Sequence, residues 1–185
     1  LGNLGNVYIN QAQYDKAIEH YTQALAISRD IGNKRSEGVD LGNLGLLYQA
    51  LGEFDRAIAF YTQALAIARD IGNKRSEGIN LGNLGNVHQD QGEFAQAIAH
   101  FNQSLAIARE VGDKRSEGIN LGNLGTVYLD QGKFDQAIAH YTKSIAIHRE
   151  VGNKRVEGNH LGNLGLAYQA QGKLDQAIAT YTQSI

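Results

Sequence analysis

The chain has 185 residues, of which 42% are hydrophobic, and its 17 Lys and Arg residues nearly balance its 19 Asp and Glu residues. This composition is typical of a globular protein that folds in water. A formal net charge of -2 argues against electrostatic binding of nucleic acid. The sequence has no apolar run long enough to span a bilayer and no signal-peptide pattern, so no membrane partner is expected. The lack of Cys excludes disulfides and thiolate metal sites and fits a reducing, cytoplasmic compartment.

A five-residue stretch, Leu-Gly-Asn-Leu-Gly, opens the chain at Leu1 and returns at Leu41, Leu81, Leu121 and Leu161. It marks a 40-residue repeat with four full copies (1–40, 41–80, 81–120 and 121–160) and a partial copy, 161–185, and each adjacent pair of full copies shares 26 residues. A repeat of this length is one supersecondary unit stacked on its neighbours, so we predict a single array over 1–185. Because the chain lacks Met and starts and stops inside the pattern, we expect it to be a fragment of a larger protein.

The third copy shows the elements of the repeat. Apolar residues recur at helical spacing from Phe94 to Val111, and Gly112 follows as a left-handed C-cap. Asp113, which is Asn in the sister copies, is placed to cap the N-terminus of another helix that runs from Lys114 to about Asp130. A short turn containing Gly92 separates the two kinds of helix within the copy. The sequence therefore predicts an all-α chain of alternating helices, each of roughly 17 residues.

Two glycines recur in the first helix of every copy, although a helical Gly costs about 1 kcal/mol relative to Ala. On a helical wheel Gly85 falls on the apolar face with Leu81 and Leu84, which packs on the second helix. We expect close helix packing to require this glycine, whose copies are Gly5, Gly45, Gly85, Gly125 and Gly165. Two interpretations stay open for the other glycine, a bare groove floor beneath a ligand or close packing of neighbouring first helices. Its copies are Gly2, Gly42, Gly82, Gly122 and Gly162.

Several positions of the repeat carry a family resemblance. The second copy reads Leu41-x2-Leu44-Gly45-x2-Tyr48, then Gly52, Ala57-x3-Tyr61 and Ala64-Leu65. This resembles the tetratricopeptide (TPR) pattern, with Leu in place of the usual Trp. The 40-residue length resembles the long-helix subtype of Pins-type spindle-orientation adaptors and bacterial signalling proteins. The resemblance implies an all-α, right-handed α-solenoid of antiparallel helix pairs, a TPR superhelix of about 4.6 repeats. It also implies a scaffold that binds a protein or an extended peptide in its concave groove.

The same resemblance places one side of each first helix on the groove. An asparagine recurs there, and its amide can both donate to and accept from a peptide group of any sequence; the copies are Asn3, Asn43, Asn83, Asn123 and Asn163. An arginine suited to acidic groups of a partner recurs nearby, as Arg35, Arg75, Arg115 and Arg155. Positions that vary between copies, where selective pockets would lie, include Asn86, Asp90 and Asp130. The alternatives are asparagines bonded to neighbouring helices or water, and drift at exposed sites. For the arginines, the alternative is an ion pair with Glu37 and its copies or with the Asp or Glu at the end of the second helix.

No catalytic, metal or cofactor site is predicted. Three histidines on second helices, His20, His100 and His140, are expected roughly 10 Å apart, too far to share a zinc ion. His88 replaces a core Tyr and is expected in the interior. No Ser/His/Asp or paired-carboxylate arrangement stands out, so no enzyme activity is expected. Two alternatives to a binding scaffold remain, a structural spacer whose open ends stack with other copies, and the sensor arm of an enzyme whose catalytic domain lies outside this sequence.

Overall fold

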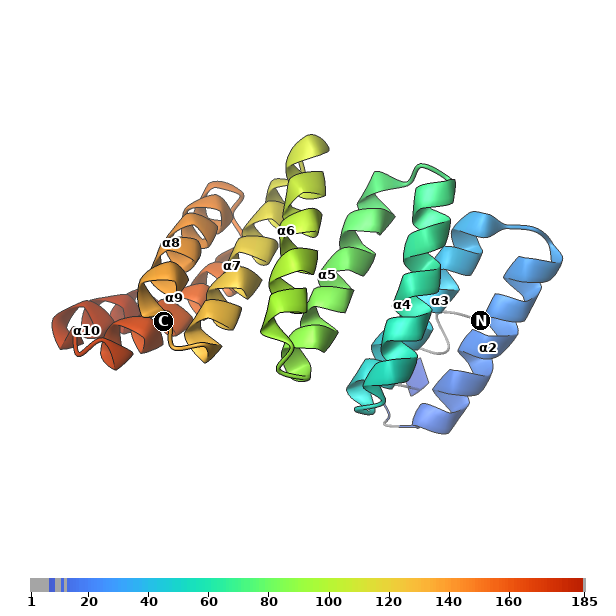
Figure 1. The fold of residues 1–185 in the computed structure, drawn as a ribbon, viewed down its shortest axis with the longest axis horizontal. Helices are drawn as coiled ribbons and strands as arrows, with labels where there is room; N and C mark the ends of the chain where they lie inside the picture. Colours follow the sequence, from blue (N-terminus) through green and yellow to red (C-terminus); the bar gives the residue numbers. More distant parts are fainter. Residues whose placement is uncertain (1–6, 9–10, 12, 185) are drawn as a thin grey trace. The chain divides into compact units, whose positions relative to one another are not determined.

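The computed structural model describes residues 7–8, 11 and 13–184. These residues form helices and no strands, which confirms the predicted all-α class. Within each of its two units, consecutive helices are antiparallel and are joined by tight turns (Figure 1). The chain divides into two compact units, residues 1–91 and 92–185. The first holds α2 (Tyr14–Asp30), α3 (Lys34–Ala50), α4 (Phe54–Asp70) and α5 (Lys74–Asp90). The second holds α6 (Phe94–Glu110), α7 (Lys114–Asp130), α8 (Phe134–Glu150), α9 (Lys154–Ala170) and α10 (Leu174–Gln183).

A few residues in each repeat set the turns between helices. Gly112, between α6 and α7, has a φ of 69°, a conformation that residues with a side chain rarely adopt. Asp113 Oδ1 then accepts a hydrogen bond from the Ser116 backbone N–H at 3.0 Å, and Asn33 caps α3 in the same way through Ser36. The predicted side-chain cap is confirmed at Asn33, Asn73 and Asp113, whereas Asn153 makes no cap hydrogen bond to α9.

The core lies between consecutive helices. In the second unit, one face of α8 packs on one face of α9, and apolar residues spaced three and four apart supply both faces. The buried members of this cluster are Ala137, Tyr141, Ile145, Leu161, Leu164 and Ala167. Small and large side chains alternate across the junction, which brings the two helices close together.

At Gly45, Gly125 and Gly165, the second glycine of the Leu-Gly-Asn-Leu-Gly stretch lies against a tyrosine ring of the following helix. A Cβ at Gly45 would lie 2.6 Å from Tyr61 Cδ1, and a Cβ at Gly125 would lie 2.9 Å from Tyr141 Cδ1. Because these distances are shorter than van der Waals contact, a side chain would push the helices apart. The predicted packing role is confirmed at Gly45, Gly125 and Gly165. Gly5 lies outside the described residues.

The first glycine of the stretch behaves differently in the two units. A Cβ at Gly42 would be 3.7 Å from Asn80 Oδ1 and would face an open groove, whereas a Cβ at Gly122 would collide with the ring of His160. The groove-floor interpretation therefore fits Gly42, and the packing interpretation fits Gly122. Gly2 lies outside the described residues.

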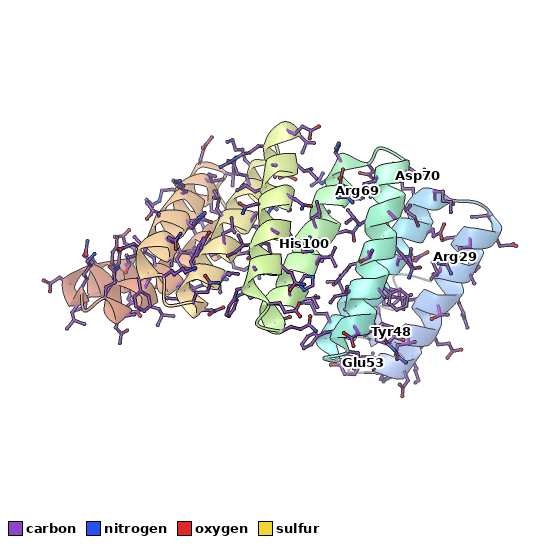
Figure 2. All side chains as sticks on the ribbon, viewed as in Figure 1. Arg29, Tyr48, Glu53, Arg69, Asp70 and His100 are labelled. Atoms are coloured by element: carbon purple, nitrogen blue, oxygen red, sulfur yellow. The ribbon has the colours of Figure 1, made fainter. Side chains whose placement is uncertain are left out.

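A buried glutamate joins each second helix to the first helix that follows it. Glu37 accepts hydrogen bonds from Arg29 Nε and Lys34 Nζ, both at 2.9 Å. The arrangement recurs at Glu77, Glu117 and Glu157. Figure 2 labels Arg29 and Arg69, which occupy matching positions in the last turns of α2 and α4. The hydrogen bonds from Lys34 and Arg29 lower the pKa of Glu37, so its carboxylate stays ionised at the helix junction.

These glutamate junctions correct one alternative from the sequence. The glutamates pair with Arg29 and its copies Arg69, Arg109 and Arg149, and Arg35, Arg115 and Arg155 do not pair with them. Arg35 follows Lys34 by one residue and so lies about 100° further around the helix. In the part of the chain that the structure describes, Arg35, Arg115 and Arg155 form no ion pair.

Candidate functional site

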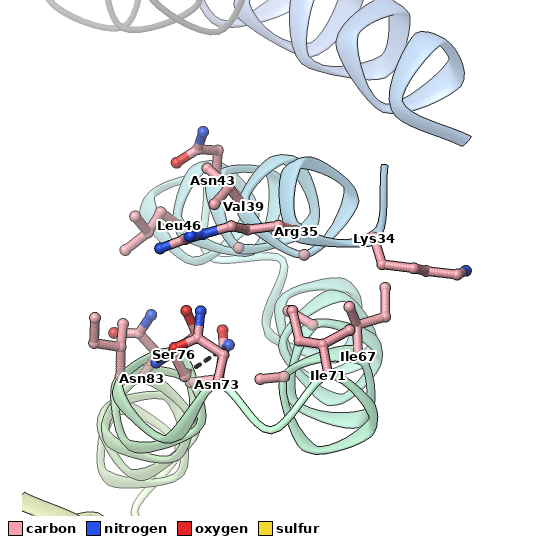
Figure 3. A pocket seen from close by; sticks show the side chains of 16 residues that line it. Lys34, Arg35, Val39, Asn43, Leu46, Ile67, Ile71, Asn73, Ser76 and Asn83 are labelled. Atoms are coloured by element: carbon pink, nitrogen blue, oxygen red, sulfur yellow. Dashed lines mark hydrogen bonds between the residues drawn. The ribbon is translucent and has the colours of Figure 1, made fainter. Parts of the chain in front are cut away.

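A groove opens in the first unit where α3, α4 and α5 meet (Figure 3). Its volume is about 210 Å³. Both first helices, α3 and α5, supply polar and apolar side chains, and α4 supplies apolar ones. The residues that matter most for its chemistry are Arg35, Val39, Leu46, Ile79, Asn80 and Asn83. Asn43 also belongs to the lining, so the groove includes two of the predicted asparagines and one of the predicted arginines.

Figure 3 shows how these polar groups are placed. Asn83 projects from α5 toward α3, and the guanidinium of Arg35 lies over the space between these two helices. The amide of Asn43 projects from α3 on the side away from α5. Among the described residues, neither asparagine side chain has a hydrogen-bond partner, and Arg35 is exposed. The groove therefore presents amide and guanidinium groups that can bond to another molecule.

Three large aliphatic side chains of the groove are half exposed to solvent. The exposed fraction is 54% for Val39, 51% for Leu46 and 52% for Ile79. Leu46 and Val39 lie on α3, and Ile79 lies on the facing first helix, α5. Exposed apolar surface beside a few convergent polar groups is a common feature of binding sites.

Two of the other predicted groove residues make contacts inside the protein. Asn163 lies near the Tyr141 hydroxyl, which donates to Thr126 Oγ1 at 3.0 Å. Burial raises the pKa of Tyr141 to about 12, and the polar groups of Thr126 and Asn163 act against that increase. Asp90 Oδ2 accepts from Gln49 Nε2 at 2.8 Å. The alternative of an internal contact thus fits Asn163 and Asp90.

The remaining predicted residues are spread over the two units. Asn86, Asn123, Asp130 and Arg75 each interact with another residue. Arg115 and Arg155 are exposed near the beginnings of α7 and α9. Asn3 lies outside the described residues. Among the predicted residues, the groove of the first unit brings together Arg35, Asn43 and Asn83.

A buried polar cluster in the second unit was missed by the sequence reasoning. Ser144 Oγ donates to the Gly118 carbonyl at 2.6 Å and lies 2.7 Å from His160 Nδ1. Because the hydroxyl has one proton, His160 must carry its proton on Nδ1 and donate to Ser144. The ring of His148 lies 5.5 Å from that of His160, centroid to centroid. Ser144 and His148 are fully buried, so the Ser144–His160 pair is a structural contact and not an accessible nucleophile.

Sequence differences between the copies could have indicated this cluster. The positions of Ser144, His148 and His160 are occupied by Ala64, Ala68 and Asn80 in the second copy and its junction with the third. Polar substitutions that fall together at three interior positions indicate a local network, but their proximity becomes visible only when α8 and α9 are packed.

The histidines of the second helices belong to ring stacks. His20 stacks on Tyr8 with centroids 5.1 Å apart, and His140 stacks on Tyr128 at 5.2 Å. His88 is buried, as predicted. Within the described ranges there is no cluster of three or more metal-ligating side chains and no helix long and apolar enough to cross a membrane.

The repeat, the helix pairs and the packing glycines define a helical repeat protein. The family model described as "Tetratricopeptide repeat" matches residues 1–70, 76–150 and 116–185. The chain therefore belongs to the tetratricopeptide repeat family. A search of curated protein sequences finds no match to the chain.

Solved structures of other repeat proteins share the fold. BtubC (BKLC) from P. vanneervenii is 20% identical with a TM-score of 0.88, over 98% of this chain and 75% of that one. A Rap protein complexed with Competence and Sporulation Factor is 19% identical with a TM-score of 0.86, over 100% of this chain and 52% of that one. A STAND protein with a tetratricopeptide repeat sensor, PH0952 from Pyrococcus horikoshii, is 18% identical with a TM-score of 0.85, over 96% of this chain and 28% of that one. At these identities the likeness concerns the fold.

Proposed function

We propose that this chain is a protein-binding scaffold that holds an extended segment of a partner across α3 and α5, over the groove between them. The observation that carries the proposal is the composition of the groove. Asn43 and Asn83 have side-chain amides without partners in the described part of the chain, and Arg35 is exposed beside half-exposed aliphatic residues. An amide can satisfy both the N–H and the C=O of a bound peptide, and a guanidinium suits a carboxylate.

The spacing of the first helices fits an extended ligand. Neighbouring first helices of such an array lie roughly 10 Å apart, whereas an extended peptide advances about 3.3 Å per residue. One asparagine would therefore meet the backbone of the partner at about every third residue. The apolar side chains between the asparagines would contact the partner side chains in between.

The similar structures are consistent with this proposal. The Rap protein was solved in complex with Competence and Sporulation Factor, and the STAND protein is described as having a repeat sensor. The second of these also favours the alternative of a sensor arm within a longer protein. Both functions require the groove to bind a partner. The absence of Cys from the chain fits a cytoplasmic setting for such a partner.

A double substitution tests the proposal. A peptide is first selected from a random library by binding to the unaltered chain, and its Kd is then measured for Asn43→Ala/Asn83→Ala. Each lost hydrogen bond should cost about 0.5 to 1.5 kcal/mol, so the Kd should rise roughly 5- to 150-fold. Thermal stability should not fall, because Ala is the better helix former.

Asn163→Ala is the matched control, because Asn163 lies in the second unit beside Tyr141 and outside the groove. This variant should lose stability and leave the Kd of a peptide bound in the first unit unchanged. Equal binding by the double variant would refute the role of the asparagines. If no peptide is selected at all, the chain is better described as a spacer.

A further inference from the structure

The groove of the first unit and the histidine cluster of the second unit occupy the same place in the repeat. Residues 80 positions apart correspond, since two 40-residue repeats separate them. Ala64, Ala68 and Asn80 of the groove correspond to Ser144, His148 and His160 of the cluster. The same place between neighbouring helices is therefore an open groove in the first unit and is filled by histidine side chains in the second unit.

In the second unit, imidazole rings lie directly on glycine backbone. A Cβ at Gly118 would lie 2.7 Å from His148 Nε2, and a Cβ at Gly122 would collide with His160. In the first unit, the corresponding glycines are bare. A Cβ at Gly38 would come no closer than 3.4 Å to its nearest neighbour, Ile67 Cγ2. The groove thus exists because Ala68 lacks the ring that His148 places against the glycine.

One acceptor oxygen that lines the groove has no hydrogen-bond donor among the described residues. Asn80 is only 5% exposed, and its Nδ2 donates to the Ser76 carbonyl at 2.9 Å. No donor within the described residues reaches its Oδ1, which lies on the Gly42 side of the groove. Because this oxygen faces the open groove, it is available to accept a hydrogen bond from a ligand N–H group placed there.

We propose that the groove binds the neutral imidazole ring of a histidine in the partner segment, packed on Gly38 and Gly42 with its N–H donating to Asn80 Oδ1. The ring takes the place that His148 occupies against Gly118 in the second unit. Arg35, exposed at the same groove and without an ion pair among the described residues, favours an acidic residue next to that histidine. That the ring comes from a partner rests on the proposed function, whereas the fit of the ring to the groove does not.

Free imidazole at about pH 8, where it is neutral, is the first probe. Titration into the isotope-labelled chain is followed by NMR. Saturable shifts are expected at the side-chain amide of Asn80 and the backbone amides of Gly38 and Gly42, with none at Gly118 and Gly122. N-methylimidazole cannot donate, so it should bind roughly 2- to 12-fold more weakly. Equal binding of the two probes, or shifts scattered over the surface, would refute the assigned geometry.

Two variants exchange the contents of the two sites. Ala64→Ser/Ala68→His/Asn80→His places in the groove the side chains that the second unit already accommodates, and it should abolish the imidazole shifts. His148→Ala/His160→Asn should open the second site and add saturable shifts at Gly118 and Gly122. Because the two variants are independent, the inference stays testable if one of them does not fold. It fails if the first variant binds imidazole unchanged and the second gains no site.

Capped dipeptides test the source of the ring. Acetyl-His-Asp-amide should bind more tightly than acetyl-His-Ala-amide, and Arg35→Gln should remove the difference. Acetyl-Ala-Asp-amide should produce no saturable shift at Asn80. If imidazole binds but the histidine dipeptides do not, the groove has a ring site, and the proposal that a partner histidine occupies it is wrong. If Asn43→Ala/Asn83→Ala weakens a selected peptide while the filled-groove variant does not, the proposed function stands and this inference fails.

Discussion

Acidification is expected to loosen the junction of α8 and α9 through His148 and His160. Burial is the main cause that lowers the pKa of both imidazoles, and the nearby His148 lowers that of His160 further. On the neighbouring helices, Arg115 of α7 lowers the pKa of His148 further, whereas Glu157 of α9 and the Gly118 backbone raise it. Other groups that face the pair are the Tyr141 ring, 6.0 Å from His160, and Asn153 Nδ2, 3.4 Å from His148 Nδ1.

The magnitude follows from the pKa of His160, which is lowered from 6.5 to about 4 in the folded chain. Between these two pH values the unfolded chain binds a proton that the folded chain does not bind. The contribution of His160 to stability is therefore complete above about pH 6.5, decreases as the pH falls, and is lost at about pH 4. A difference of roughly 2.5 pKa units corresponds to at most about 3 kcal/mol. His148 shifts in the same direction and adds to the loss.

The assay has two parts. An NMR titration of the imidazole Cε1–H signals should show no protonation of His160 near pH 6.5 while the chain is folded. Urea unfolding between about pH 7.5 and pH 4.5 should then show a steep loss of stability in the unaltered chain and a shallower one in His160→Asn. Asn is the matched replacement, because Asn80 and Asn120 occupy this position in the sister copies. Titration of His160 near 6.5, or equal pH slopes for the two chains, would refute the reasoning.

Two pairs of substitutions test the glycine packing and the glutamate ion pairs of the repeat. Gly125→Ala should destabilise the second unit by about 1 to 3 kcal/mol, because its Cβ would lie 2.9 Å from the Tyr141 ring. Gly162→Ala, where no atom lies within 4 Å of the added Cβ, should be neutral or gain up to about 1 kcal/mol; thermal denaturation of the two variants compares them, and equal effects would contradict the packing role. Glu117→Gln should cost about 1 to 2 kcal/mol, because it weakens the contacts from Arg109 and Lys114. Arg155→Gln, at a residue without an ion pair in the described chain, should change the unfolding free energy by less than about 0.5 kcal/mol.

The sequence alone was sufficient for the helices, their ends and the family. Apolar spacing from Phe94, the stop at Gly112 and the cap at Asp113 depend on neighbours within a few residues, and local interactions decide them. The role of Gly45 was also predictable, because the repeat shows that a costly helical glycine is retained at one fixed position. Because the unit repeats, the elements predicted for one copy were expected at the equivalent positions of the other copies.

Only the tertiary structure decided the partners of the charged and polar side chains. Glu37 forms ion pairs with Arg29 of the preceding helix and with Lys34 of its own helix. A helical wheel cannot predict whether these cations or Arg35 will be its partners. Equivalent positions also have different environments. Gly42 borders an open groove while Gly122 lies under His160, because the contact is made by a helix some 40 residues away whose side chain differs between copies. Interactions between residues close in sequence determine the backbone of each repeat. Whether the space between two repeats is open or filled depends on side chains that are far apart in sequence and meet only when the helices pack.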